Sequence, residues 1–146
     1  MTKRVLLTVS GVIASDIHEQ IARGRRPRAD FLELARGFDA DILDYAAART
    51  ATGRLGALLE RIVGPNLLLA FASWKLRSHY RAIFTDGEQI GLPLAALLKV
   101  TPGARPRHLM IVHVISEPKK TVFLDRLGVQ TCIDLFDCIL IGPGFQ

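Results

Sequence analysis

The sequence predicts an α/β fold with an open parallel sheet of about five strands and helices on both faces. Short apolar runs rich in β-branched residues alternate with stretches of helical periodicity along the 146 residues. The apolar runs are continuous, which is typical of parallel strands that are buried on both faces. Strands and helices that alternate in this way are joined by right-handed crossovers.

The length of the chain predicts one domain, residues 1–146, because a chain of this size buries one sizeable core but not two. No internal repeat and no long linker divides it. The strands are predicted at residues 4–10, 40–45, 82–85, 109–115 and 137–141. The helices are predicted at residues 30–38, 54–80, 88–100 and 121–127.

Local signals support the predicted helices. Asp30 stands where the N-cap of the first helix is expected. The pair Gly64-Pro65 interrupts the second helix, because proline removes a helical hydrogen bond. Before this break, one apolar face of the helix is formed by Leu55, Leu58, Leu59, Ile62 and Val63.

The charge of the chain indicates an anionic partner. The formal net charge is +5 and the isoelectric point is near 9.7. Much of the excess lies within residues 23–36, where no aromatic residue separates Arg23, Arg25, Arg26 and Arg28 as a stacking platform for single strands requires. We therefore expect no nucleic acid partner.

Cofactor and metal signals are weak. The two cysteines, Cys132 and Cys138, are too few for a metal cluster, and no zinc-type Cys/His spacing is present. Neither a dinucleotide fingerprint nor a P-loop occurs, so we expect no bound cofactor. The cysteines fit a reducing compartment, and the first apolar run is too short for a signal peptide. These features predict a cytoplasmic location.

Three loops that follow predicted strands carry the candidate site residues, because ligands of open parallel sheets bind beyond the carboxyl ends of strands. Gly11 follows the first strand and either admits a ligand or forms a tight turn. Asp86, Gly87 and Glu88 follow the third strand, where Glu88 also suits a helix N-terminus. His113 lies near the end of the fourth strand and is either a catalytic or a core histidine. His108, at the other end of that strand, is expected to be structural.

Two segments, YRAIFTDGEQIGLPLA at residues 80–95 and PRHLMIVHVIS at residues 106–116, resemble the N-terminal domain of family-4-like glycosyltransferases. The resemblance implies a Rossmann-like, acceptor-side domain of a GT-B enzyme that moves a sugar from a nucleotide-sugar donor to an acceptor hydroxyl, without a metal. It implies that His113 is catalytic and helps to hold the transferred sugar. It also places Gly11, Asp86, Gly87 and Glu88 among the acceptor- or sugar-binding groups.

The sequence departs from this family in lacking the second Rossmann-like domain that binds the donor. We therefore expect a truncated half-domain that is inactive alone. Its expected partners are the missing C-terminal donor domain and a sugar or lipid acceptor. The donor sugar, the acceptor and the stereochemical outcome are left open.

An alternative from another class is a non-catalytic α/β module that binds a partner protein or an anionic membrane surface. Residues 23–36 and the apolar stretch 67–74 would form that surface, with peripheral contact at the inner membrane face. The decisive feature is whether Leu68, Phe71 and Trp74 are buried or form an exposed stripe. A receiver-like domain is disfavoured, because paired acidic residues do not follow the first strand.

Overall fold

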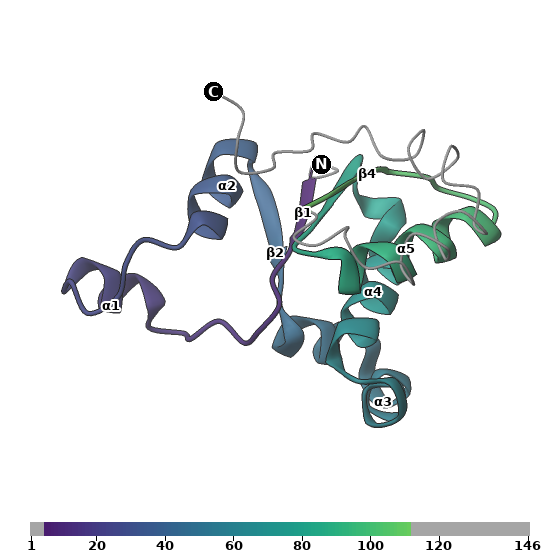
Figure 1. Cartoon of the computed structure of the whole chain (residues 1–146), viewed down its shortest axis with the longest axis horizontal. Coiled ribbons are helices and arrows are strands. Elements are labelled where there is room, and N and C mark those ends of the chain that lie inside the picture. The colour runs from purple at the N-terminus through teal and green to yellow at the C-terminus, as the bar shows by residue number, and fades with distance from the viewer. Residues whose placement is uncertain (1–4, 112–146) are drawn as a thin grey trace, which may run out of the picture.

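The computed structural model describes residues 5–111 of the chain (Figure 1). The strands are β1 (Val5–Thr8), β2 (Ala40–Leu43), β3 (Ala82–Thr85) and β4 (Arg107–Met110). The helices are α1 (Ile17–Ala22), α2 (Asp30–Phe38), α3 (Tyr45–Val63), α4 (Pro65–Leu76) and α5 (Glu88–Val100), and the 3-10 turn Arg77–His79 follows α4. His113, the predicted helix 121–127 and the predicted strand 137–141 lie outside the described residues.

The described strands form one sheet with the order β2-β1-β3-β4, and every pairing in it is parallel. Val5 of the central strand β1 is in register with Ala40 of β2 and with Ala82 of β3. The predicted α/β class and the parallel sheet are thereby confirmed. The sheet has four strands within residues 5–111, and the fifth expected strand falls beyond them.

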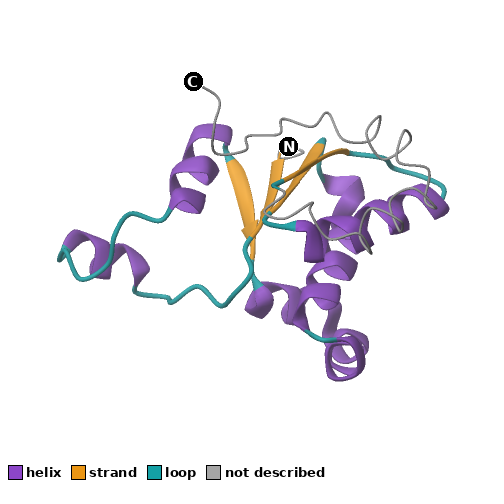
Figure 2. Ribbon diagram, viewed as in Figure 1, coloured by secondary structure: helices purple, strands orange, loops and turns teal. Residues whose placement is uncertain are grey.

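Helices flank this sheet on both sides, as Figure 2 shows. The chain moves from β1 to β2 in one direction and from β2 to β3 and β4 in the other. Because parallel crossovers are right-handed, this reversal places α2 on one face and α4 and α5 on the other. The point of reversal lies between β1 and β3. In open parallel sheets such a switch point forms the crevice where ligands bind.

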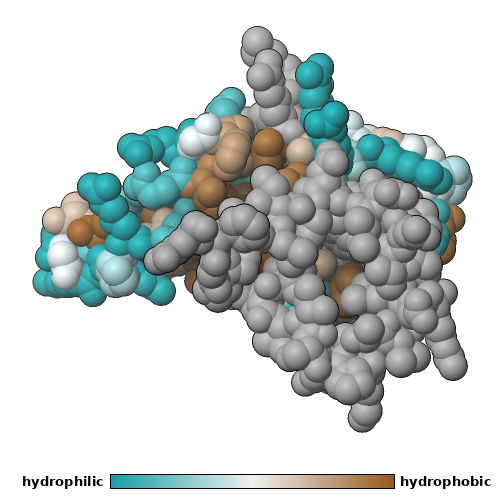
Figure 3. Space-filling view, turned by 45° about the horizontal axis from the view of Figure 1, so that its top comes forward, coloured by the Kyte–Doolittle hydropathy of each residue, from teal (hydrophilic) through white to brown (hydrophobic). Residues whose placement is uncertain are grey.

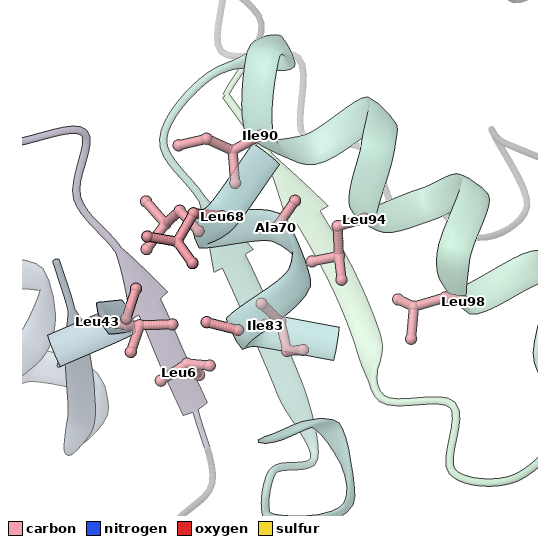
Figure 4. Packing of buried hydrophobic residues seen from close by; sticks show 11 residues of the cluster. Leu6, Leu43, Leu68, Ala70, Ile83, Ile90, Leu94 and Leu98 are labelled. Carbon is pink, nitrogen blue, oxygen red and sulfur yellow. The ribbon is translucent and has the colours of Figure 1, made fainter. Parts of the chain in front are cut away.

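The core lies between the sheet and the α4 and α5 helices (Figure 4). Leu6 and Ile83 from the sheet meet Leu68 from α4 and Leu94 from α5, and each is at most 1% exposed. Helix α4 is apolar around much of its circumference because it is covered by α3, α5 and the sheet. Gly91 lets α5 approach the sheet closely, since a Cβ there would collide with Met110.

The helix predicted at residues 54–80 begins earlier than expected, and it is divided into α3 and α4 at the expected break. The start at residue 54 was wrong, because α3 begins at Tyr45, where the Asp44 side chain accepts a hydrogen bond from the Ala47 amide. Such an N-cap starts a helix directly after the strand. The helix is kinked at Gly53, which has φ 61° and ψ −141°. The predicted break is confirmed, since Gly64 has φ 88° and Pro65 opens α4.

The N-terminal part of the chain contains a helix that was not predicted. Helix α1 projects away from the sheet, and hydrophilic side chains cover most of that end of the molecule (Figure 3). Only Ile17 of this helix is buried, so it has no apolar face that periodicity could reveal. The expected N-cap at Asp30 was also wrong by one residue, because Asp30 is the first residue of α2 and Ala29 is its N-cap.

Candidate functional site

The polar loops that follow β1, β2 and β3 meet at the carboxyl edge of the sheet. Because the strands are parallel, residues that follow each of them share this edge. Gly11 follows β1, and Asp86, Gly87 and Glu88 follow β3, so these four predicted residues flank the switch point. The fifth predicted residue, His113, lies outside the described residues.

Two hydrogen bonds join the loops after β1 and β3. The Asp86 amide donates to Thr8 Oγ1 at 3.1 Å, and Ser10 Oγ donates to the Asp86 carbonyl oxygen at 3.2 Å. The Asp86 backbone is therefore tied to β1 through both its N–H and its C=O groups. This fixes the Asp86 backbone relative to the first loop.

The loop after β1 is also tied to the loop after β2. Asp44, which is 8% exposed, accepts hydrogen bonds from the Ile13 amide at 2.8 Å and from the Ala47 amide at 2.7 Å. The Tyr45 amide donates to the Gly11 carbonyl oxygen at 2.9 Å. Both carboxylate oxygens of Asp44 are thus engaged with backbone groups. Asp44 holds the loops in place rather than facing a ligand.

The glycines and acidic residues at the switch point differ in how open they are. Among the described residues, no atom beyond those of Gly11 and its chain neighbours lies within 4 Å of the position that a Cβ at Gly11 would take, which leaves the backbone open to a ligand on this side. Gly87 has φ 104° and is the N-cap of α5, a conformation that favours glycine. Glu88, in the first turn of α5, is only 7% exposed, whereas Asp86 is half-buried. Asp86 is thus the more accessible carboxylate of the two.

Two further residues, which the sequence did not single out, extend this site. The Tyr45 hydroxyl donates to Asn66 Oδ1 at 2.5 Å, so the start of α3 is joined to the start of α4. Burial raises the pKa of the Tyr45 phenol, a hydrogen bond with Ser10 opposes that rise, and the charge of Asp86 adds to it. The bond from the Tyr45 amide to the Gly11 carbonyl oxygen holds this residue beside the loop after β1. No motif could have indicated Tyr45, because the helix was not expected to begin there.

The described histidine of β4 belongs to the core. His108 is 1% exposed, and its Nε2 lies 3.0 Å from Thr85 Oγ1. Burial lowers the pKa of His108 to about 4. An imidazole with this pKa is neutral at physiological pH. Its burial agrees with the structural role expected for it.

The described part of the chain holds no cluster of three or more His, Cys, Asp or Glu residues suited to a metal ion. What the edge offers instead is a set of hydroxyl, amide and carboxylate groups around an open glycine. Chemically, such groups exchange hydrogen bonds with the hydroxyls of a polar ligand.

The fold and this edge define the class of protein: a parallel α/β protein whose polar loops meet at the switch point of the sheet. No protein-family model matches the chain, and the comparisons with curated proteins and with solved structures found no match either.

Proposed function

We propose that this chain is the acceptor-side domain of a glycosyltransferase that moves a sugar from a nucleotide-sugar donor to an acceptor hydroxyl. The observation that carries the proposal is the position of Gly11 and of Asp86, Gly87 and Glu88 on either side of the switch point between β1 and β3. The sequence resemblance of residues 80–95 and 106–116 points to the same family.

The chemistry of the edge favours a hydroxyl-rich ligand. A carboxylate has about four lone-pair sites, so Asp86 can accept from a sugar hydroxyl in addition to its contacts within the protein. Gly11 allows the ring of a sugar to approach the backbone. Tyr45 and Asn66 lie at the border of the same edge, where their polar groups can contact a second part of the acceptor.

The same loops do not favour a diphosphate. Residues 9–15 contain no Lys or Arg, and residues 86–91 contain two acidic residues and no basic one. Diphosphates are usually held by cationic side chains or by glycine-rich loops that open a helix. In the proposal, a second Rossmann-like domain therefore binds the nucleotide part of the donor. His113 of the present domain helps to hold the transferred sugar.

The test is an NMR titration of the 146-residue chain with glucose, mannose, N-acetylglucosamine, myo-inositol and UDP-glucose as separate probes. We expect at least one of the four hydroxyl-rich probes to shift the amides of Gly11 and of residues 86–88, and UDP-glucose to have no larger effect than free glucose. Asp86→Asn should weaken that binding about tenfold, in the range of a hydrogen bond to a charged group.

The matched control is Asp39→Asn. Asp39 is an exposed carboxylate that follows α2, and its replacement should leave the titration unchanged. Tight binding of UDP-glucose at the loops after β1 and β3 would contradict the acceptor-side assignment. Shifts that avoid this edge for every probe would contradict the site itself.

A second candidate is the non-catalytic module that binds a membrane or a protein. The apolar stretch 67–74 that was expected to form part of its surface is largely covered, because Leu68 is fully buried and Phe71 and Trp74 are half-buried. Within residues 23–36, three of the arginines form ion pairs with glutamates: Arg23 with Glu19, and Arg28 and Arg36 with Glu33. One other observation does favour a binding module, namely the exposed apolar side chains of α3.

A further inference from the structure

Helix α3 carries an apolar stripe that faces solvent. Leu55 is 58% exposed, Leu58 is 56% exposed and Ile62 is 71% exposed. These residues are three and four positions apart, so they lie on one face of the helix and form what we call the α3 stripe. Val63 and Leu67 extend the exposed apolar surface toward the start of α4.

The stripe is exposed because the opposite face of α3 is the one that packs. Gly56 is buried, and a Cβ at that position would meet Leu68 Cδ1 of α4 at 3.0 Å. The close contact between the two helices uses this face and leaves the stripe directed outward. Contiguous exposed apolar side chains bordered by polar residues are typical of binding surfaces.

The exposed charges on α3 beside the stripe are positive. Within α3 (Tyr45–Val63) there are three basic residues, Arg49, Arg54 and Arg61, and one acidic residue. The acidic residue, Glu60, is bound by the Arg49 guanidinium, with Nε donating at 2.8 Å. Arg54 and Arg61 are exposed, and their seven-residue spacing puts them together along one side of the stripe.

We propose that the α3 stripe binds the surface of an anionic lipid bilayer, with the helix lying parallel to the membrane plane. The apolar side chains enter the interface while Arg54 and Arg61 contact the negative head groups. No helix within residues 5–111 is long and apolar enough to cross a membrane. With α3 lying in the plane of the membrane, the proposed contact is peripheral.

A second copy of the chain is a poorer occupant of this surface. A two-fold contact pairs each surface with itself, so it must be self-complementary. Pairing two α3 stripes would bring Arg54 and Arg61 of both copies close together, and the one acidic residue of α3 is already held by Arg49. Anionic lipid supplies the charge that such a pairing lacks.

The proposal also places the carboxyl edge of the sheet on the membrane side of the molecule. The strands run toward the end of the molecule where α3 lies (Figure 1). Tyr45 begins α3 at that edge, and its hydroxyl is bonded to Asn66. An acceptor carried by a lipid would thus be presented to the loops after β1 and β3. Membrane binding itself does not depend on the proposed enzymatic function.

The experiment is co-sedimentation of the 146-residue chain with vesicles of phosphatidylcholine alone or with about 30% phosphatidylglycerol, a composition that gives the negative surface potential basic residues recognise. We expect tighter binding to the anionic vesicles, weakened by added salt. The double variant Leu58→Gln/Ile62→Gln should lower the partition coefficient at least about tenfold. Arg54→Gln and Arg61→Gln should each lower it about fivefold.

The matched control is Phe38→Gln on α2, which replaces another exposed apolar residue and should leave vesicle binding unchanged. Because all the replaced side chains are exposed, the melting temperature of each variant should match that of the wild type. Equal binding to both kinds of vesicle, no binding, or equal loss with Phe38→Gln would overturn the proposal. A dimer in sedimentation that Leu58→Gln/Ile62→Gln dissociates, without vesicle binding, would assign the surface to a second copy.

Discussion

His108 should make the stability of the fold depend on pH in the acid range. Its imidazole is 1% exposed, and burial lowers its pKa from 6.5 to about 4. Between these two values the unfolded chain binds a proton that the folded chain does not. The contribution of the neutral His108 to the free energy of unfolding is therefore fully present above pH 6.5, and it is lost as the pH drops toward 4. A shift of this size corresponds to about 3 kcal/mol of free energy of unfolding.

The assay is urea unfolding of the wild type and of His108→Gln at a series of pH values from 7.5 to about 4, the window that the two pKa values define. Gln keeps a hydrogen-bonding group near Thr85 Oγ1, to which His108 Nε2 is now 3.0 Å away, but cannot titrate. The carboxylates of the chain titrate in both proteins, so their contribution cancels in the difference between the two curves. The wild type should lose about 1.4 kcal/mol per pH unit relative to the variant.

A difference between the two curves that does not change with pH would refute the reasoning. It would mean that His108 titrates near its ordinary pKa in the folded chain. An NMR titration of the imidazole supplies an independent reading, since the folded protein should show no protonation of His108 at pH 6. If His108→Gln is less stable at neutral pH, that loss reports on packing. The pH dependence is judged only from how the difference between the two proteins changes with pH.

Three other outcomes follow from the structure and the proposal. Asp44→Ala should lower the free energy of unfolding by about 2 to 3 kcal/mol, because the N-cap of α3 and the bond to Ile13 are both lost, and urea unfolding that shows no change would contradict this role. Ultraviolet titration should find that Tyr80 ionises only at about pH 12, owing to burial and to its hydrogen bond with Asp41. Asp41→Asn should lower the pKa of Tyr80, and an unchanged titration would show that Asp41 does not raise this pKa. The 146-residue chain alone should transfer no sugar from UDP-glucose, and in a protein that includes a donor domain His113→Ala should reduce turnover roughly a hundredfold without lowering the melting temperature. Robust transfer by the chain alone, or an unstable but active His113→Ala, would contradict these roles.

The sequence predicted the layers of the fold well because continuous apolar runs and helical periodicity are local signals. It did not predict where α3 begins. Asp44 directly follows β2 and caps α3, so no loop separates the two elements, and the apolar pattern does not change at this residue. For this reason Tyr45 and Asn66 were missed as parts of the edge. The positions of Gly11 and of Asp86, Gly87 and Glu88 followed from the rule that parallel strands share a carboxyl edge. What they bind did not follow from it.

Periodicity identifies an apolar face of a helix but not what that face contacts. Helices α3 and α4 are two examples. The face containing Leu55, Leu58 and Ile62 has the spacing of a core-facing helix and yet is exposed. The stretch 67–74 was the candidate for an exposed surface and yet contains Leu68, which is fully buried. The difference arises because the other side of α3, which contains the buried Gly56, packs against α4, a contact between segments that no local pattern encodes.

The charges of the chain are divided between two regions rather than spread evenly. The loops after β1 and β3 carry carboxylates and no Lys or Arg, while residues 45–85 carry the net positive charge. A protein that recognised its anionic partner at the carboxyl edge would need the reverse distribution. The arrangement instead suits an edge that binds neutral hydroxyls and an α3 surface that binds negative head groups. The two proposals can therefore fail separately, since Asp86→Asn should affect only the sugar titration and Arg54→Gln only the binding to anionic vesicles.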